Sequence, residues 1–215
     1  MAIDDIGLWC ELGKPDAASR PALFLDRDGI ILADTNYVGR AEDVRMIDGV
    51  ATEIARCNAL QIPVVVVTNQ SGIARGLYDW NGFAAVQAAI SAALAAAGAH
   101  LDGVLACAYH GEGPEPLRIA DHAWRKPNPG MILAAGKGMN LDLARSWIVG
   151  DKARDLAAGA AAGLAGGTLV MADECERQKT IRLANSRFFV ETATNPADAL
   201  AVLAESGRLA KPAQS

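Results

Sequence analysis

Two aspartates stand directly after a short apolar run near the start of the chain. The run 22–25 leads into Asp26 and Asp28, and Gly29 follows. Such a run is typical of a strand buried on both faces, and open α/β sheets hold their chemistry at the carboxyl ends of such strands. Alternate residues of a strand share a face, so the two carboxylates can converge on one small volume. Because like charges repel, that geometry requires a cation between the carboxylates or a proton on one of them.

The pattern Asp-X-Asp-Gly also begins calcium-binding loops and ordinary turns. Here Ile31, Leu32 and Ala33 follow the glycine, where a calcium loop would continue with Asn or Asp and end in Glu. The apolar residues therefore disfavour a calcium loop. A simple turn stays open as an interpretation of this stretch alone.

Polar side chains also stand after other predicted strands. The valine-rich segment 62–67 is the strongest strand signal in the chain, and a second apolar segment, 147–149, precedes Gly150. The first segment is followed by Thr68, Asn69, Gln70 and Ser71, and the second by Asp151 and Lys152. Arg125 and Lys126 stand in the loop before the helix that leads to the second segment. Because the carboxyl ends of parallel strands meet at one edge of a sheet, these groups can come together there. Each alone could instead cap a helix or be a solvated surface charge.

Hydrophobic periodicity predicts strands that alternate with helices. The expected strands lie near 22–25, 62–67, 104–107, 147–149, 168–171 and 188–190, and the expected helices near 50–60, 81–97, 130–138, 152–163 and 199–203. This alternation predicts an α/β fold, a doubly wound, Rossmann-like parallel sheet with helices on both faces and no large cap domain. We expect 1–20 to be an N-terminal extension, 21–206 the domain with a loop insertion at about 108–127, and 207–215 a C-terminal tail.

Composition limits the classes of protein and partner. The chain has 215 residues with a net charge of -5, and 51% of them are hydrophobic, which suits a single sizeable core. The negative charge argues against nucleic acid or an anionic membrane as the main partner, although a local group of cations can still bind a small anion.

Four scattered cysteines without a Cys-X-X-Cys pair favour a reducing compartment, and no signal peptide or membrane-spanning run is evident. We expect a cytoplasmic protein, and a monomer because the alanine-rich helices show no interface stripe.

The residues at the predicted strand ends suit phosphoryl transfer. Asp26 could attack phosphorus if Mg²⁺ and cationic donors neutralise the phosphoryl oxygens. Asp28 could protonate the leaving oxygen and then take a proton from the hydrolytic water. Thr68 and Lys126 could hold the phosphoryl oxygens. Asp26, the Asp28 main-chain carbonyl and Asp151 would form the oxygen-rich ligand set that Mg²⁺ prefers.

Four segments together resemble the haloacid dehalogenase (HAD) superfamily of phosphatases, and within it the heptose bisphosphate and histidinol-phosphate phosphatases. They are 24–29, 65–76, 125–131 and 149–152. The string Thr-Asn-Gln-Ser-Gly-Ile-Ala-Arg-Gly at 68–76 is far more specific than Asp-X-Asp, and the resemblance covers about 22–203. It implies a Mg²⁺-dependent phosphomonoester hydrolase that forms an aspartyl phosphate. The first substrate candidate is D-glycero-D-manno-heptose 1,7-bisphosphate, losing its 7-phosphate, and histidinol phosphate or another small metabolite phosphate is the alternative.

The resemblance also implies residue roles. Asp26 would be the nucleophile, Asp28 the general acid and base, Thr68 and Lys126 the phosphoryl stabilisers, and Asp151 the third metal ligand. Among further implied substrate contacts, Arg27 and Arg75 are candidates for a second phosphate or a polar head group. The full set of implied substrate-binding residues is Arg27, Asp34, Thr35, Asn36, Tyr37, Asn69, Gln70, Ser71, Arg75, Arg125 and Lys152.

The loop insertion departs from the pattern of many relatives, which hold a structural Zn²⁺ there through Cys-X-His and Cys-X-Cys. The matching positions here are Cys107, Tyr109, His122 and Trp124, so only two of the four can bind zinc, with His110 nearby. A structural zinc site requires four ligands. We therefore predict that structural Zn²⁺ is absent and that the aromatic residues and prolines hold the loop.

Three other functions are compatible with parts of this pattern. A phospho-accepting signalling domain also uses Asp, Thr and Lys at parallel strand ends, but Asp28 beside the nucleophile favours rapid hydrolysis instead. A dehalogenase works without metal, whereas Asp28 and Asp151 together favour Mg²⁺. A catalytically silent binding module is disfavoured because all four catalytic groups are present.

Overall fold

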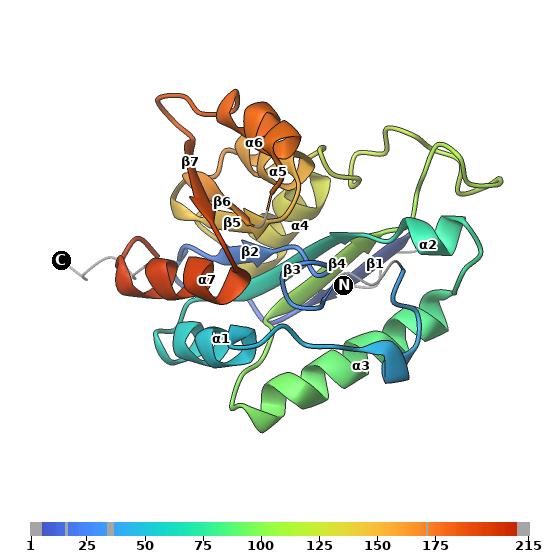
Figure 1. Ribbon diagram of the computed structural model, residues 1–215, viewed down its shortest axis with the longest axis horizontal. Helices are drawn as coiled ribbons and strands as arrows, with labels where there is room; N and C mark the ends of the chain where they lie inside the picture. The colour runs from blue at the N-terminus through green and yellow to red at the C-terminus, as the bar shows by residue number, and fades with distance from the viewer. Residues whose placement is uncertain (1–5, 16, 34–36, 171, 210–215) are drawn as a thin grey trace.

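The computed structural model describes residues 6–15, 17–33, 37–170 and 172–209. At its centre lies a seven-stranded sheet in the order β1-β4-β3-β2-β5-β6-β7 (Figure 1). The strands are β1 (Leu8–Leu12), β2 (Leu23–Leu25), β3 (Val64–Asn69), β4 (Gly103–Cys107), β5 (Trp147–Gly150), β6 (Gly166–Val170) and β7 (Phe189–Ala193). The α-helices are α1 (Val50–Ala59), α2 (Ser71–Ala74), α3 (Trp80–Ala96), α4 (Gly130–Met139), α5 (Ala153–Ala162), α6 (Glu174–Ile181) and α7 (Pro196–Glu205). Two short 3-10 helices are η1 (Ala41–Asp43) and η2 (Leu143–Arg145).

Helices cover both faces of the sheet, as Figure 1 shows. On one face, residues of α1, α3 and α7 share a core with Leu23 and Leu25 of β2. On the other face, residues of α4 and α5 share a second core with Phe24 of β2 and with Val65 and Val67 of β3. Because successive side chains of a strand point to opposite faces, a strand between two helical layers is apolar at every position. The expected doubly wound α/β fold with helices on both faces is confirmed.

The order of the strands creates a crevice beside β2. Strand β2 pairs in parallel with β3 on one side and with β5 on the other. The strands that follow β2 in the sequence are therefore added first on one side of it and then on the other. Leu25 is level with Val66 of β3 and with Val149 of β5. Open α/β sheets bind ligands at such a switch point, outside the carboxyl ends of the strands. The residues after β2, β3 and β5 are therefore brought to one place.

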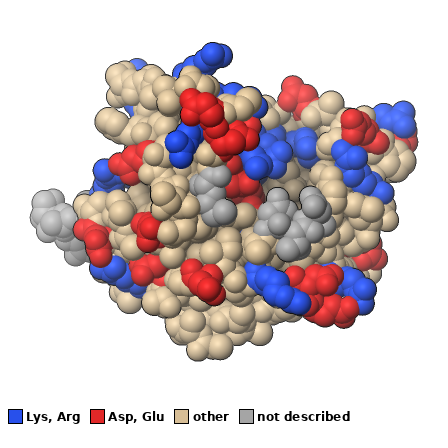
Figure 2. Space-filling view, viewed as in Figure 1, with Lys and Arg blue, Asp and Glu red and all other residues tan. Residues whose placement is uncertain are grey.

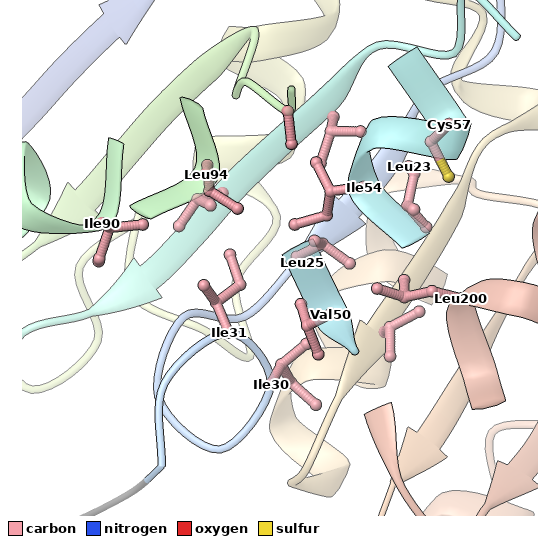
Figure 3. Close-up of a cluster of buried hydrophobic side chains, with 14 of the residues drawn as sticks. Leu23, Leu25, Ile30, Ile31, Val50, Ile54, Cys57, Ile90, Leu94 and Leu200 are labelled. Carbon is pink, nitrogen blue, oxygen red and sulfur yellow. The ribbon is translucent and has the colours of Figure 1, made fainter. Parts of the chain in front are cut away.

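The turn after β2 is anchored in the core. Ile30 and Ile31 are fully buried, and Figure 3 shows both beside Val50 of α1. The main-chain carbonyl of Arg27 accepts hydrogen bonds from the N–H groups of Ile31, at 2.9 Å, and Leu32, at 3.0 Å. The segment that carries the two aspartates is thus held by packing as well as by hydrogen bonds, which restricts its movement.

Part of the segment 1–20 lies in the sheet, although the sequence predicted an N-terminal extension. Its residues Leu8–Leu12 form strand β1, which pairs antiparallel with β4 and covers that edge of the sheet. Leu8 packs against one core and Trp9 against the other. The run is short and contains Glu11, so its pattern alone did not distinguish an edge strand from a surface segment.

Helix α6 was also not expected. Its sequence, Glu-Cys-Glu-Arg-Gln-Lys-Thr-Ile, is almost entirely polar, and Thr180 is its one buried residue. A helix without an apolar stripe gives no periodic signal. The insertion 108–129 between β4 and α4 contains neither helix nor strand. Within the described residues, no helix combines the length and hydrophobicity needed to cross a membrane.

Candidate functional site

Asp26 lies at the end of β2, and its side chain is fixed from two directions. Its own N–H donates to the carbonyl of Val149 in β5 at 3.0 Å, which continues the pairing of the two strands beyond Leu25. One carboxylate oxygen, Oδ1, accepts the N–H of Arg27 at 2.8 Å and lies 2.9 Å from the ammonium of Lys126. Only 4% of Asp26 is exposed, so its charge is balanced by protein groups rather than by bulk water.

Lys126 reaches Asp26 from the loop before α4. Its ammonium lies 2.7 Å from Asp155 and donates to the carbonyl of Val67 at 2.8 Å. The Asn69 side chain binds the main chain of Lys126 twice, because its Oδ1 accepts the Lys126 N–H and its Nδ2 donates to the Lys126 carbonyl, each at 3.0 Å. Burial opposes the charge on Lys126, but the carboxylates of Asp155 and Asp26 outweigh it and raise its pKa. The lysine is therefore a fixed, charged group.

Three carboxylates from separate elements meet beside this lysine. Asp26, Asp151 and Asp155 each offer one oxygen, and these oxygens lie within 4.8 Å of one another. Burial, followed by the negative charges of Asp26 and Asp155, raises the pKa of Asp151 to about 6. Lys152 offsets this in part from 3.1 Å. A hard divalent cation that prefers oxygen ligands fits this arrangement, because it would relieve the repulsion among the acids.

Two glycines let the acids approach each other. Gly29 has φ +84°, and a Cβ there would stand 3.0 Å from the carboxyl carbon of Asp151. A Cβ at Gly150 would stand 2.4 Å from the Cβ of Asp155. A side chain at either position would push the acids apart, and the conformation of Gly29 is one that residues with a Cβ rarely adopt.

Asp28 belongs to a second network on the other side of Asp26. Arg27 donates from Nε and Nη2 to both carboxylate oxygens of Asp28, at 3.0 to 3.3 Å. Gln70 donates from Nε2 to Asp28 at 3.0 Å and to the Thr68 hydroxyl at 2.9 Å. The Gln70 carbonyl accepts from Arg27 at 3.1 Å and from the Tyr78 hydroxyl at 2.6 Å. Burial raises the pKa of Asp28, while the charge of Arg27 works in the opposite direction. Gln70 thus links Asp28 to Thr68.

Comparisons with known proteins agree with this geometry. A family model described as HAD-hydrolase-like matches residues 123–195. A D-glycero-beta-D-manno-heptose-1,7-bisphosphate 7-phosphatase from Mesorhizobium japonicum is 52% identical over 166 residues, which make up 76% of this chain and 76% of that protein. This chain belongs to the HAD-like hydrolase family.

Two crystal structures of HAD-like proteins extend the similarity to the fold. A protein from Mesorhizobium loti described as a HAD-like phosphatase has a TM-score of 0.86 at 42% identity, with 99% of both chains covered. The D,D-heptose 1,7-bisphosphate phosphatase from B. bronchiseptica, complexed with magnesium and phosphate, has a TM-score of 0.72 at 31% identity. That match covers 86% of this chain and 99% of the other. The resemblance inferred from the sequence and the phosphatase class are confirmed.

The HAD-like site brings together the residues that the sequence analysis placed at strand ends. Thr68 is buried at the end of β3, within the network of Gln70 and Asp28. A polar cavity of about 220 Å³ opens beside this network. Its lining residues are Asp28, Tyr37, Asn69, Gln70, Ser71, Tyr78 and Arg154. Tyr37, Asn69, Gln70 and Ser71 are among the predicted substrate-binding residues, whereas Asp34, Thr35 and Asn36 lie outside the described residues.

The three arginines predicted to bind substrate already have partners within the protein. Arg75 forms an ion pair with Glu112 at 2.7 Å, and Arg125 donates to the carbonyl of Tyr109 at 2.8 Å. Arg27 is 1% exposed and is held by Asp28 and Gln70, with its guanidinium 5.3 Å from the centre of the Phe83 ring. These contacts place the Arg27 guanidinium as a support for the Asp28 carboxylate. A contact between Arg27 and the substrate stays a prediction.

Sequence reasoning missed three residues of the HAD-like site. Asp155 is fully buried and pairs with Lys126, and its Oδ2 also accepts the N–H of Lys152 at 3.0 Å. Its position four residues after Asp151, in the first turn of the predicted helix, was a signal that could have identified it. Tyr78 and Arg154, which line the cavity, carry no comparable local signal because only the fold brings them there.

Aromatic side chains pack against each other in the loop insertion. The rings of Tyr109 and His122 stack with centroids 4.3 Å apart, and the His122 Nδ1 accepts the N–H of Trp124 at 3.1 Å. Among the described residues, the three-acid cluster is the one group of His, Cys, Asp or Glu side chains close enough to hold a metal ion. The absence of structural Zn²⁺ stays a prediction.

Proposed function

We propose that this HAD-like protein is a Mg²⁺-dependent hydrolase that removes the 7-phosphate of D-glycero-D-manno-heptose 1,7-bisphosphate through an aspartyl phosphate. The observation that carries the proposal is the Asp26 carboxylate, held 2.9 Å from the Lys126 ammonium within a cluster of three acids. The names of the relatives from Mesorhizobium japonicum and B. bronchiseptica support this substrate.

In the first step, a carboxylate oxygen of Asp26 attacks phosphorus, so that a new O–P bond forms and the ester P–O bond breaks. Asp28 gives its proton to the leaving sugar oxygen, and burial favours the protonated form that this role requires. In the second step, Asp28 takes a proton from the water that cleaves the aspartyl phosphate. Lys126 and the Thr68 hydroxyl would hold the phosphoryl oxygens and stabilise the charge that develops on them.

Asp26, Asp151 and the main-chain carbonyl of Asp28 would hold Mg²⁺. When bound, the ion would neutralise phosphoryl oxygens that would otherwise be repelled by the attacking carboxylate. Asp155 has a separate task, because its carboxylate is already engaged by Lys126 and by the N–H of Lys152. We propose that Asp155 positions the lysine.

The substitution Asp26→Asn tests the nucleophile. It keeps the size of the side chain but replaces the attacking carboxylate with an amide, so Mg²⁺-dependent phosphate release should be abolished while the fold is retained. Phosphate release measured alongside circular dichroism and thermal unfolding checks both parts. Full turnover by the folded variant would overturn the assignment of Asp26.

The substrate is tested with a panel of phosphomonoesters in the presence of Mg²⁺. The panel contains D-glycero-D-manno-heptose 1,7-bisphosphate, histidinol phosphate and short sugar phosphates, and we expect the highest kcat/KM for the heptose bisphosphate. Phosphate analysis of the product identifies which ester bond was cleaved. A higher kcat/KM for histidinol phosphate would replace the proposed substrate but keep the reaction.

A further inference from the structure

The cavity beside Asp28 contains a cation that the proposed reaction does not use. Arg154, the second residue of α5, lines this cavity together with Asp28 and Ser71. It is exposed, and among the described residues none forms an ion pair with its guanidinium. An arginine in a polar cavity beside an active-site acid, without an acidic partner of its own, is available to a ligand.

Two other arginines act on the same region from separate segments. They are Arg75, at the end of α2, and Arg125, in the loop before α4. Arg125 is close enough to both Arg75 and Arg154 for their charges to act on it. Burial lowers the pKa of Arg125, and the positive charges of Arg154 and Arg75 lower it further. Figure 2 shows acidic and basic side chains gathered around the hollow in the middle of this face. Repulsion among cations in a chain of net charge -5 is offset when an anion binds between them.

The neighbouring cations are already engaged, which distinguishes Arg154 from them. Lys152 lies 3.1 Å from Asp151, and Arg75 lies 2.7 Å from Glu112. Arg125 uses Nη1 to donate to a main-chain carbonyl. A guanidinium offers a planar fork of donors that matches two oxygens of a phosphate, so Arg154 has both the charge and the geometry to bind one.

We propose that Arg154 is a specificity residue that binds a second anionic group of the substrate, away from the phosphate that Asp26 attacks. The inference rests on the proposed phosphatase function and adds to it the residue that would hold the phosphate that is not cleaved. Arg125, which donates a hydrogen bond to a main-chain carbonyl, adds positive charge near this second group. Tyr37 and Ser71 bring hydroxyl groups to the same cavity, where they can hydrogen-bond the polar chain between the two phosphates.

The test compares two sugars that differ only in the second phosphate. For each enzyme, kcat/KM is measured with D-glycero-D-manno-heptose 1,7-bisphosphate and with D-glycero-D-manno-heptose 7-phosphate, and the ratio is reported. We expect the unmodified protein to favour the bisphosphate and Arg154→Gln to lower the ratio about tenfold, as for the loss of one charge-assisted pair. Arg154→Lys keeps the charge but not the fork, so it should restore part of the ratio.

Arg187→Gln is the matched control. Arg187 is also exposed, but it lies two residues before β7 and so stands at the amino end of the parallel strands, opposite the site. Its substitution removes the same net charge and should leave the ratio as in the unmodified protein. If Arg154→Gln and Arg187→Gln change the ratio equally, the effect belongs to net charge and the proposal for Arg154 is overturned.

Equilibrium binding separates this proposal from the proposed reaction. Calorimetry with Asp26→Asn and with Asp26→Asn/Arg154→Gln compares the Kd values of the same two sugars without turnover. A tenfold loss of preference in the double variant supports the second-anion site even if the unmodified protein hydrolyses neither sugar, a result that would overturn only the reaction. Equal preferences in the two variants would overturn the site, whatever the activity.

Discussion

Lys126 is shared by two carboxylates that would otherwise repel each other. The ammonium lies 2.9 Å from Asp26 and 2.7 Å from Asp155, and almost no part of the three side chains reaches solvent. Removing charges from water is costly, and the cost is met here by the pairing and by the hydrogen bond to the Val67 carbonyl. At the residue scale, the site is therefore a charge balance in which Asp155 keeps Lys126 in place for Asp26.

The substitution Asp155→Asn removes one charge from this buried pair. We expect the free energy of unfolding in the presence of Mg²⁺ to fall by about 3 kcal/mol, because breaking a buried ion pair leaves its partner less compensated. Chemical denaturation measures the change. Glu205→Gln is the control, since Glu205 and Arg56 form an exposed ion pair at 3.1 Å, and such pairs contribute less than about 1 kcal/mol. Equal effects of the two substitutions would contradict the role given to Asp155.

At the scale of elements, strand β1 connects the edge of the sheet to the support of the site. Trp9 of β1 contacts the rings of Trp80 and Phe83 of α3, at centroid distances of 5.9 and 5.3 Å. Phe83 in turn lies against the guanidinium of Arg27, which holds Asp28. The strand Leu8–Leu12, which the sequence analysis assigned to an extension, thus packs against the residues behind Asp28.

Trp9→Ala tests the contribution of β1. Loss of the aromatic contacts and the space left behind should lower the free energy of unfolding by about 3 kcal/mol. Urea denaturation measures the change, and Phe189→Ala provides the control because the Phe189 side chain is largely exposed. A change below about 0.5 kcal/mol for Trp9→Ala would show that β1 is dispensable for stability.

At the scale of the whole molecule, the strand order determines where negative charge accumulates. Asp26 follows β2, Asp151 follows β5, and Asp155 lies in the first turn of α5, so the pairing of β2 with β5 brings all three together. The helices on both faces keep these strands buried and leave their carboxyl ends open. A cation at this point would act on the fold as well as on the reaction.

Removal of Mg²⁺ should therefore affect both activity and stability. We expect EDTA to stop phosphate release and lower Tm, and added Mg²⁺ to restore both, because a ligand that binds only the folded state stabilises it. In Asp151→Asn, Mg²⁺ should raise Tm less than in the unmodified protein. Metal analysis of the purified protein completes the test, and stoichiometric Zn²⁺ would contradict the prediction for the loop insertion.

The sequence by itself determined the elements whose signals are local. The apolar runs of β2, β3 and β5 indicated buried strands, and Asp26, Asp28 and Asp151 were recognisable because each lies within three residues of the end of such a run. These signals depend only on neighbouring residues and on the two-residue period of a strand. The α/β class and the edge of the sheet that holds the site follow from them.

Only the tertiary structure decided which distant groups meet. The pairing of β1 with β4, the burial of Arg27 behind Asp28, the ion pair of Asp155 with Lys126 and the place of Arg154 in the cavity all join separate segments. Whether a charged side chain faces solvent, a partner or a ligand depends on strand register and helix packing. Those contacts form between residues far apart in the chain, so no local pattern of residue types could specify them.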